Sequence, residues 1–180
     1  MGLDACVFCD CLEKGRNLKP LPNDVVIKVG ADGYASVERN GEEVWEDLEC
    51  EHQFRFLIRH RLGNIALVGF LRWELNREAS SYPFLLKRVV YSGSHTGDWI
   101  GLDQLPELQA ELQRLATFKC AGNAPKSFDW SRLLPNVFPF DLWRQNYSTA
   151  AESDRFMQTF RSQMLELIEV AKRAGKPISF

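Results

Sequence analysis

The stretch FRFLIRHRLGNIALVGFLRWEL, residues 54–75, changes its hydrophobic period part-way along. In its first part apolar side chains such as Phe54 and Phe56 recur at every second position, which is typical of a half-buried strand. After Gly63 the apolar residues cover more than one face of a helical projection, and Asn64 stands where a helix N-cap is expected. The stretch therefore predicts a strand that leads directly into a central helix.

Further strands are predicted on the N-terminal side of this stretch. Residues 3–9 are apolar and β-prone, as in a buried strand. Residues 25–29 and 34–38 flank the turn sequence Gly-Ala-Asp-Gly and form a plausible hairpin. Strands this close in sequence indicate a mainly antiparallel sheet.

Two more helices are predicted on the C-terminal side. Leucines recur at steps of three and four from residue 105 to 115, with Pro106 in the first turn, where proline is tolerated. Thr149 and Glu152 fit a capping box, an apolar stripe follows, and Gly175 is placed to stop the helix. We expect a single α+β domain over residues 1–180, with a small mainly antiparallel sheet packed by three main helices at about 64–78, 104–118 and 149–174. In the second half of YPFLLKRVVYSG, residues 82–93, we expect another strand.

A long connection, residues 119–148, joins the last two predicted helices. It contains three prolines and six aromatic residues, and such an aromatic content argues against disorder. Connections of this length are usually functional or contain short helices. Whether this one is a binding surface or a cover for the core stays open.

Charge and composition exclude some classes of function. The formal net charge of −2 excludes the broad basic field that non-specific nucleic-acid binding requires. No run of about 18 uncharged apolar residues is present, so we expect no membrane span and a cytoplasmic location. The five cysteines are an odd number without a secretory signal, which indicates reduced thiols.

Four residues have the chemistry of zinc ligands: Cys9 and Cys11 in one short motif, and Cys50 and His52 in another. Two observations weaken this interpretation. The motif C-x-C is less usual than C-x₂-C, and an extended chain over residues 3–11 would place Cys9 and Cys11 on one face and Cys6 on the other. Small buried thiols in a strand are the alternative.

A compact group of polar residues occurs in YSGSHTGDWIGLD, residues 91–103. His95 and Asp98, combined with a cysteine, have the residue types of a thiol catalyst, but nothing in the sequence places a cysteine beside them. Glycine, serine, threonine and aspartate are also the ordinary residues of turns. We therefore expect a bend that displays His95, Asp98 and Trp99, rather than a catalytic loop.

Residues 40–54 contain six carboxylates and no lysine or arginine. We predict a short helix here, with Trp45 among the acidic side chains. A solvated helix face is the simpler interpretation. The alternative is an anionic docking surface with an aromatic anchor, which would suit a basic partner such as a nuclease. The residues in question are Glu42, Glu43, Trp45, Glu46, Asp47 and Glu49.

The segment SSYPFLLKRVVYSGSHTGDWIGLDQLPELQAELQRL, residues 80–115, resembles the signature segment of immunity proteins from bacterial polymorphic-toxin systems, in particular the type-seventy group. In that group an aromatic-proline pair precedes a loop with histidine and aspartate that ends in tryptophan, and a leucine-rich helix follows. Tyr82, Pro83, His95, Asp98 and Trp99 occupy these places. The loop departs from the group's pattern at residues 96–97.

The resemblance implies a small cytoplasmic protein that binds a cognate toxin and neutralises it, with no cofactor and no catalysis of its own. The acidic segment and the aromatic connection, together with the loop at His95, would then supply the contact surface. The alternative is a metal-dependent or thiol enzyme that uses the cysteine and histidine groups, with zinc as its cofactor.

Overall fold

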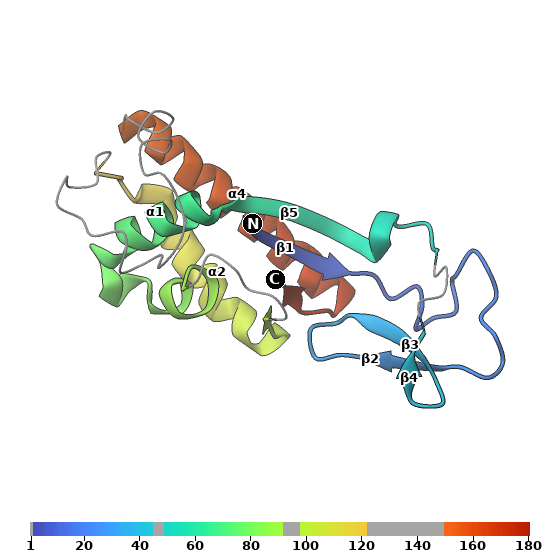
Figure 1. Ribbon diagram of the computed structural model, residues 1–180. Coiled ribbons are helices and arrows are strands. Elements are labelled where there is room, and N and C mark those ends of the chain that lie inside the picture. Colours follow the sequence, from blue (N-terminus) through green and yellow to red (C-terminus); the bar gives the residue numbers. More distant parts are fainter. Residues whose placement is uncertain (1, 45–48, 92–97, 122–149) are drawn as a thin grey trace.

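The strands of this protein form two antiparallel sheets in a computed structural model that describes residues 2–44, 49–91, 98–121 and 150–180 (Figure 1). The four-stranded sheet has the order β5-β1-β7-β6, and the three-stranded sheet has the order β2-β3-β4. All strand pairs among the described residues are antiparallel, as the sequence predicts. The strands are β1 (Gly2–Phe8), β2 (Val26–Val29), β3 (Ala35–Arg39), β4 (Glu42–Glu43), β5 (Phe56–Asn64), β6 (Trp99–Ile100) and β7 (Ile178–Ser179).

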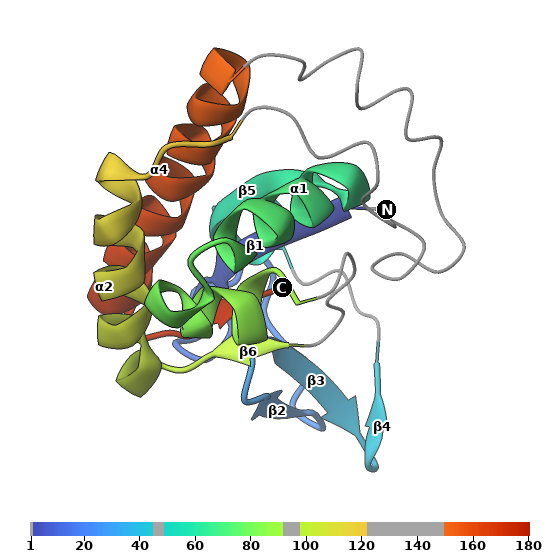
Figure 2. The same cartoon turned by 90° about the vertical axis from the view of Figure 1, so that its left-hand side faces the viewer.

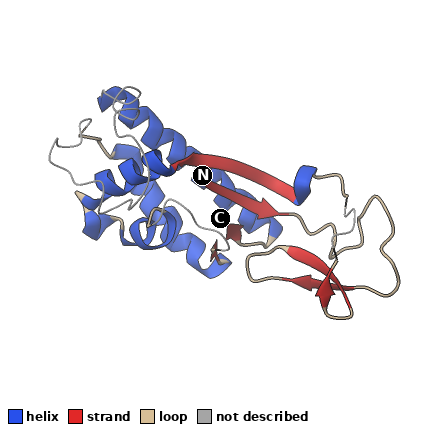
Figure 3. Cartoon of the chain, in the orientation of Figure 1, coloured by secondary structure: helices blue, strands red, loops and turns tan. Residues whose placement is uncertain are grey.

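Three longer helices pack at one end of the molecule, away from the three-stranded sheet (Figure 3). They are α1 (Ile65–Asn76), α2 (Leu105–Arg114) and α4 (Ala150–Ala174). Both α1 and α4 contact β1 and β5, and α2 runs along α4 (Figure 2). Short helical turns complete the described chain: η1 (Gln53–Arg55), η2 (Ala79–Ser81), η3 (Leu85–Val89), η4 (Leu102–Gln104) and η5 (Leu115–Thr117). The α+β class and the three predicted helices are confirmed.

Local sequence signals explain where these helices begin and end. The side chain of Asn64 accepts a hydrogen bond from the backbone N–H of Leu67 at 3.0 Å, so it caps α1 as predicted. Gly175 has a φ of 66°, the left-handed conformation that ends α4. The predicted capping box at Thr149 lies outside the described residues.

A large hydrophobic core joins the three helices to the four-stranded sheet. The buried residues of α1 cover more than one face, in agreement with its predicted central position, and the leucines of α2 are fully buried. Representative members are Leu3, Val7, Phe70, Leu71, Leu105, Leu108, Leu112, Phe160, Met164 and Ile178. This core supplies most of the apolar burial that stabilises the described fold.

The three-stranded sheet has a separate and much smaller core. Its buried hydrophobic residues are Leu12, Ala35 and Val37, with a few half-buried neighbours such as Leu21 and Ile27. So small an apolar cluster contributes little to stability, because the hydrophobic contribution scales with buried area. The second sheet therefore depends on other contacts to hold its position.

Two predicted elements are wrong. The predicted acidic helix does not begin at Glu42, because Glu42 and Glu43 form β4. Asn40 and Gly41 have φ values of 55° and 86°, and this left-handed pair closes a tight hairpin between β3 and β4. The remainder of that predicted helix includes residues 45–48, which lie outside the described part of the chain.

The second half of residues 82–93 is not a strand in its described part. Its chain forms helical turns that include η3, a π-helix. The Glu111 carboxylate on α2 accepts hydrogen bonds from the backbone N–H groups of Phe84 and Leu85, both at 2.8 Å. These bonds satisfy the free donors of a helix start. Glu111, on a helix distant in sequence, thus stabilises the helical conformation that begins at Phe84 and Leu85.

Among the residues that the structure describes, no helix combines the length and the apolar character needed to cross a bilayer.

Replacing Glu111 tests this long-range cap. Glu111 is 1% exposed, and Glu111→Gln puts an amide N–H₂ group against backbone donors, which removes one charge-assisted bond. We expect the free energy of unfolding to fall by about 2 kcal/mol, measured by urea denaturation. The matched control is Glu107→Gln, an exposed position on the same helix, which we expect to have a small effect. Equal losses in the two variants would contradict the capping role.

Candidate metal centre

The pairing of β1 with β5 brings two short motifs together from distant parts of the chain. Cys9 and Cys11 follow the end of β1, and Cys50 and His52 precede η1 and β5. Because the two strands are antiparallel, the end of β1 lies beside the start of β5, and Phe8 pairs with Phe56. The backbone N–H of Cys9 then donates to the carbonyl of Arg55 at 2.8 Å.

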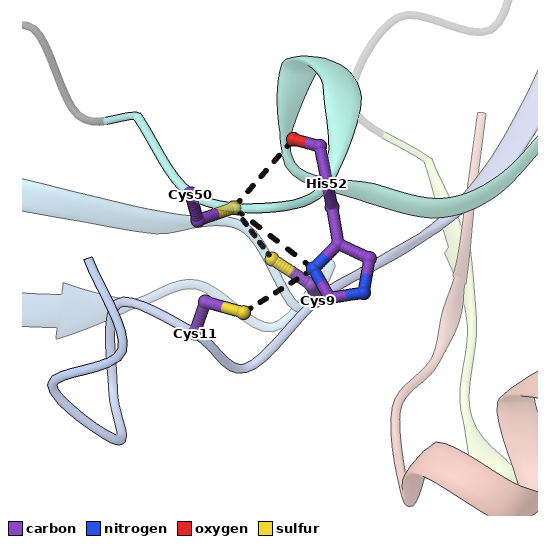
Figure 4. A group of neighbouring side chains, drawn as sticks. All are labelled: Cys9, Cys11, Cys50 and His52. Carbon is purple, nitrogen blue, oxygen red and sulfur yellow. Dashed lines mark hydrogen bonds between the residues drawn. The ribbon is translucent and has the colours of Figure 1, made fainter. Parts of the chain in front are cut away.

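The four side chains converge on one point (Figure 4). Their potential ligand atoms, three Sγ and one imidazole nitrogen, all lie within 4.8 Å of one another. The Sγ atoms of Cys9 and Cys50 are 3.7 Å apart. His52 Nδ1 lies 3.2 Å from Cys11 Sγ and 4.0 Å from Cys50 Sγ. The four residues are therefore a cluster and not separate buried thiols.

The three shorter separations lie close to the edges of a tetrahedral zinc site, whereas the outer bound of 4.8 Å is wider than such an edge. Zinc binds sulfur at about 2.3 Å and nitrogen at about 2.05 Å, so tetrahedral ligands lie about 3.8 Å apart for two sulfurs and about 3.5 Å apart for sulfur and nitrogen. The sequence interpretation considered an extended chain through residue 11, with Cys9 and Cys11 on one face. Strand β1 ends at Phe8 instead, and a turn begins that carries Cys11 back toward Cys50.

The turn after Cys11 is held by local bonds. The backbone N–H of Arg16 donates to the carbonyl of Cys11 at 2.7 Å, and Gly15 adopts a φ of 65°. The Asp10 carboxylate forms ion pairs with Lys14 and Arg16 across the same turn. The C-x-C motif thus lies on a folded segment whose shape does not depend on the ligand side chains alone.

Burial suppresses ionisation of the Cys9 and Cys11 thiols while no cation is bound. Burial and the neighbouring thiols Cys9 and Cys50 raise the pKa of Cys11 to about 12. Burial also raises the pKa of Cys9. A bound dication reverses this preference, because a coordinating thiol is deprotonated. The cluster is chemically suited to a metal and poorly suited to an unassisted thiolate nucleophile.

All four donors come from the protein, which limits the chemistry of the site. A zinc ion held by three cysteines and one histidine has a complete tetrahedral shell, which is the arrangement of structural sites. A catalytic zinc keeps a position open for water or substrate. The geometry therefore favours a structural role over the metal-dependent enzyme considered from the sequence.

Of the remaining predicted site residues, the structure describes Glu42, Glu43, Glu49, Asp98 and Trp99. Glu42 and Glu43 are exposed in β4, and exposed Glu49 forms an ion pair with Lys19 at 3.8 Å. Trp45, Glu46, Asp47 and His95 lie outside the described residues. Trp99 is 38% exposed in β6, and the Asp98 carboxylate accepts a hydrogen bond from the hydroxyl of Tyr91.

Phe54 is a surface residue that the sequence interpretation missed. The alternating pattern placed it on the buried face of a strand, but it lies in η1 and is 74% exposed. Its φ is 52° and that of Arg55 is 62°, so two consecutive non-glycine residues are left-handed.

No protein-family model matches the chain, and no curated protein or solved structure matches it significantly.

Proposed function

We propose that the protein binds one zinc ion through Cys9, Cys11, Cys50 and His52, and that this ion stabilises the part of the chain that carries the three-stranded sheet. The observation that carries the proposal is the convergence of all four ligand atoms within 4.8 Å. Three thiols and one imidazole form a soft donor set that suits zinc better than magnesium or calcium, which prefer oxygen.

The small core of the three-stranded sheet supports a structural role for the ion. In the described part of the segment between the two ligand pairs, only a few apolar residues are fully buried. Small units that cannot bury enough apolar surface are usually stabilised by a metal or by disulfides. The cysteines are free here, so a metal is the stabilising element that the donor set supports.

Metal analysis tests this proposal. We expect protein purified without a metal-binding tag to contain about one zinc per chain. A strong chelator should lower the melting temperature and make residues 12–50 sensitive to protease, while the helical part stays resistant. Protein that neither contains zinc nor binds added zinc under reducing conditions would exclude the site.

A pair of cysteine variants separates metal binding from cysteine loss in general. Cys11→Ala should abolish stoichiometric zinc, because it removes one of four ligands. Cys120→Ala is the matched control, since Cys120 is equally a buried free cysteine but lies in the main core outside the cluster. We expect Cys120→Ala to retain zinc even if its stability falls.

We further propose that the zinc-stabilised fold serves to bind a partner protein, as an immunity protein binds a toxin. The specific observation in favour is an exposed phenylalanine, Phe54, beside the metal cluster, with exposed carboxylates in the neighbouring segment of the same chain. An aromatic anchor with surrounding charge is a common arrangement in protein interfaces. The resemblance of residues 80–115 to immunity proteins agrees with such a role.

Co-expression tests the immunity function. A cell that produces the toxin encoded beside this gene should survive when it also produces this protein, and the two should co-purify. The zinc variants provide a control: Cys120→Ala should protect as the native chain does, whereas Cys11→Ala should protect less. Absence of both rescue and complex would remove the immunity proposal and leave the zinc proposal standing.

A further inference from the structure

A hollow of about 740 Å³ lies directly beside the metal cluster. Cys50 and His52 form part of its lining, so the ligand segment and the hollow share a wall. Aromatic rings make up much of the remainder: Phe8, Tyr34, Phe54 and Phe56. The hollow is large enough to accept one or two side chains of another molecule.

Phe54 lies at the edge of this hollow in a backbone conformation that is energetically unfavourable for a non-glycine residue. Left-handed conformations at Phe54 and Arg55 cost about 1–2 kcal/mol each, so the surrounding contacts must impose them. Arg55 is fixed by three bonds: its N–H donates to the His52 carbonyl at 3.0 Å, its carbonyl accepts from Cys9 at 2.8 Å, and its guanidinium donates to the Ala35 carbonyl at 2.6 Å. The exposed ring therefore projects from a rigid segment.

The walls of the hollow are fixed by ring packing. The Phe8 ring lies 5.3 Å from the rings of both Tyr34 and Phe56, and the Arg55 guanidinium lies 4.5 Å above Tyr34. Rigid aromatic surfaces lose little conformational entropy when a partner binds. This arrangement favours a preformed docking site.

The charges at the hollow indicate the chemistry of its occupant. Of its lining residues, Glu43, Glu49 and Arg55 carry a formal charge at neutral pH. Arg55 is engaged with Ala35 and Tyr34, whereas Glu43 and Glu49 are exposed. Lys19 lies near Glu49, but an exposed pair of this kind contributes little. A zinc ion with three thiolates adds a net negative charge of about one unit.

We propose that this hollow is the docking site for a basic segment of a partner protein, in which an apolar side chain is followed closely by lysine or arginine. The apolar side chain enters among Phe8, Tyr34 and Phe56. The cation contacts the face of Phe54 and the carboxylates of Glu43 and Glu49. Nucleic acid is disfavoured as an occupant, because its phosphates would meet these carboxylates. The inference rests on the proposed partner-binding function and adds its site and the chemistry of the partner.

Selection of random peptides displayed on phage, with the zinc-loaded full-length protein as target, tests this docking site. We expect the selected peptides to be enriched in lysine or arginine next to an apolar residue. Binding of a labelled synthetic copy should then be measured by fluorescence anisotropy. Phe54→Ala should weaken binding about tenfold or more, because it removes the central aromatic anchor. The double change Glu43→Gln and Glu49→Gln should weaken binding and reduce its dependence on salt.

Matched controls separate the docking site from general surface effects. Leu102→Ala removes another exposed apolar side chain, in η4 and outside the lining of the hollow, and should leave the affinity unchanged. Zinc content and melting temperature should be the same in Phe54→Ala and the native chain, because alanine and phenylalanine carry a similar backbone cost in a left-handed conformation.

Several results would overturn the inference: no selected peptide, peptides without basic enrichment, or equal binding by Phe54→Ala. A dimer of this chain that Phe54→Ala dissolves would assign the hollow to a second copy instead. These outcomes are distinguishable from failure of the proposed functions. Zinc content is measured separately, and peptides that bind in the absence of toxin rescue would retain the docking site while removing the immunity function.

Discussion

The antiparallel pairing of β1 with β5 is the constraint on which the rest of the structure depends. It spans the full length of β1, from Gly2 opposite Asn64 to Phe8 opposite Phe56. At one end of the pair, Asn64 caps α1 and leads the chain into the main core. At the other end, the same pairing brings Cys9 beside the segment that carries Cys50 and His52. One set of backbone hydrogen bonds therefore positions both the central helix and the candidate metal centre.

The two ends of this strand pair are stabilised by different physical effects. Around the helices, extensive apolar burial stabilises the fold. Both carboxylate oxygens of the buried Glu111 accept hydrogen bonds. Around the three-stranded sheet, apolar burial is small, so specific contacts must replace it. These contacts include the ion pair of Lys176 with Glu13 and the close approach of Gly33 to Pro177. A zinc ion between the two ligand motifs would add the strongest of these links.

The sequence predicts those parts of the structure that depend on local patterns. The helix at Asn64 and the leucine-rich helix follow from periodicity and capping, which neighbouring residues determine. The predictions fail where the local conformation depends on a contact with a distant residue, or on a turn signal stronger than the pattern used for the prediction. Glu111 caps helical turns where a strand was expected near Val89, and Asn40 with Gly41 closes a hairpin within the segment for which a helix was predicted. The cluster's residues were identified as zinc donors, but their convergence depends on strand pairing, which two short motifs do not reveal.

The position of Phe54 connects the metal centre to recognition in energetic terms. An exposed phenylalanine on a flexible segment would lose conformational freedom when a partner binds. In the unbound protein, its ring could pack against neighbouring residues of the same chain. The left-handed backbone at Phe54 and Arg55 fixes the position from which the ring projects, but it costs free energy that the surrounding contacts must offset. The ligand segment at Cys50 and His52 precedes this strained pair directly, and the Cys9 backbone bond fixes it from the other side. Metal binding would therefore stabilise the strained backbone at Phe54 and Arg55 as well as the sheet, so the proposed zinc ion and the proposed docking surface would form one physical unit.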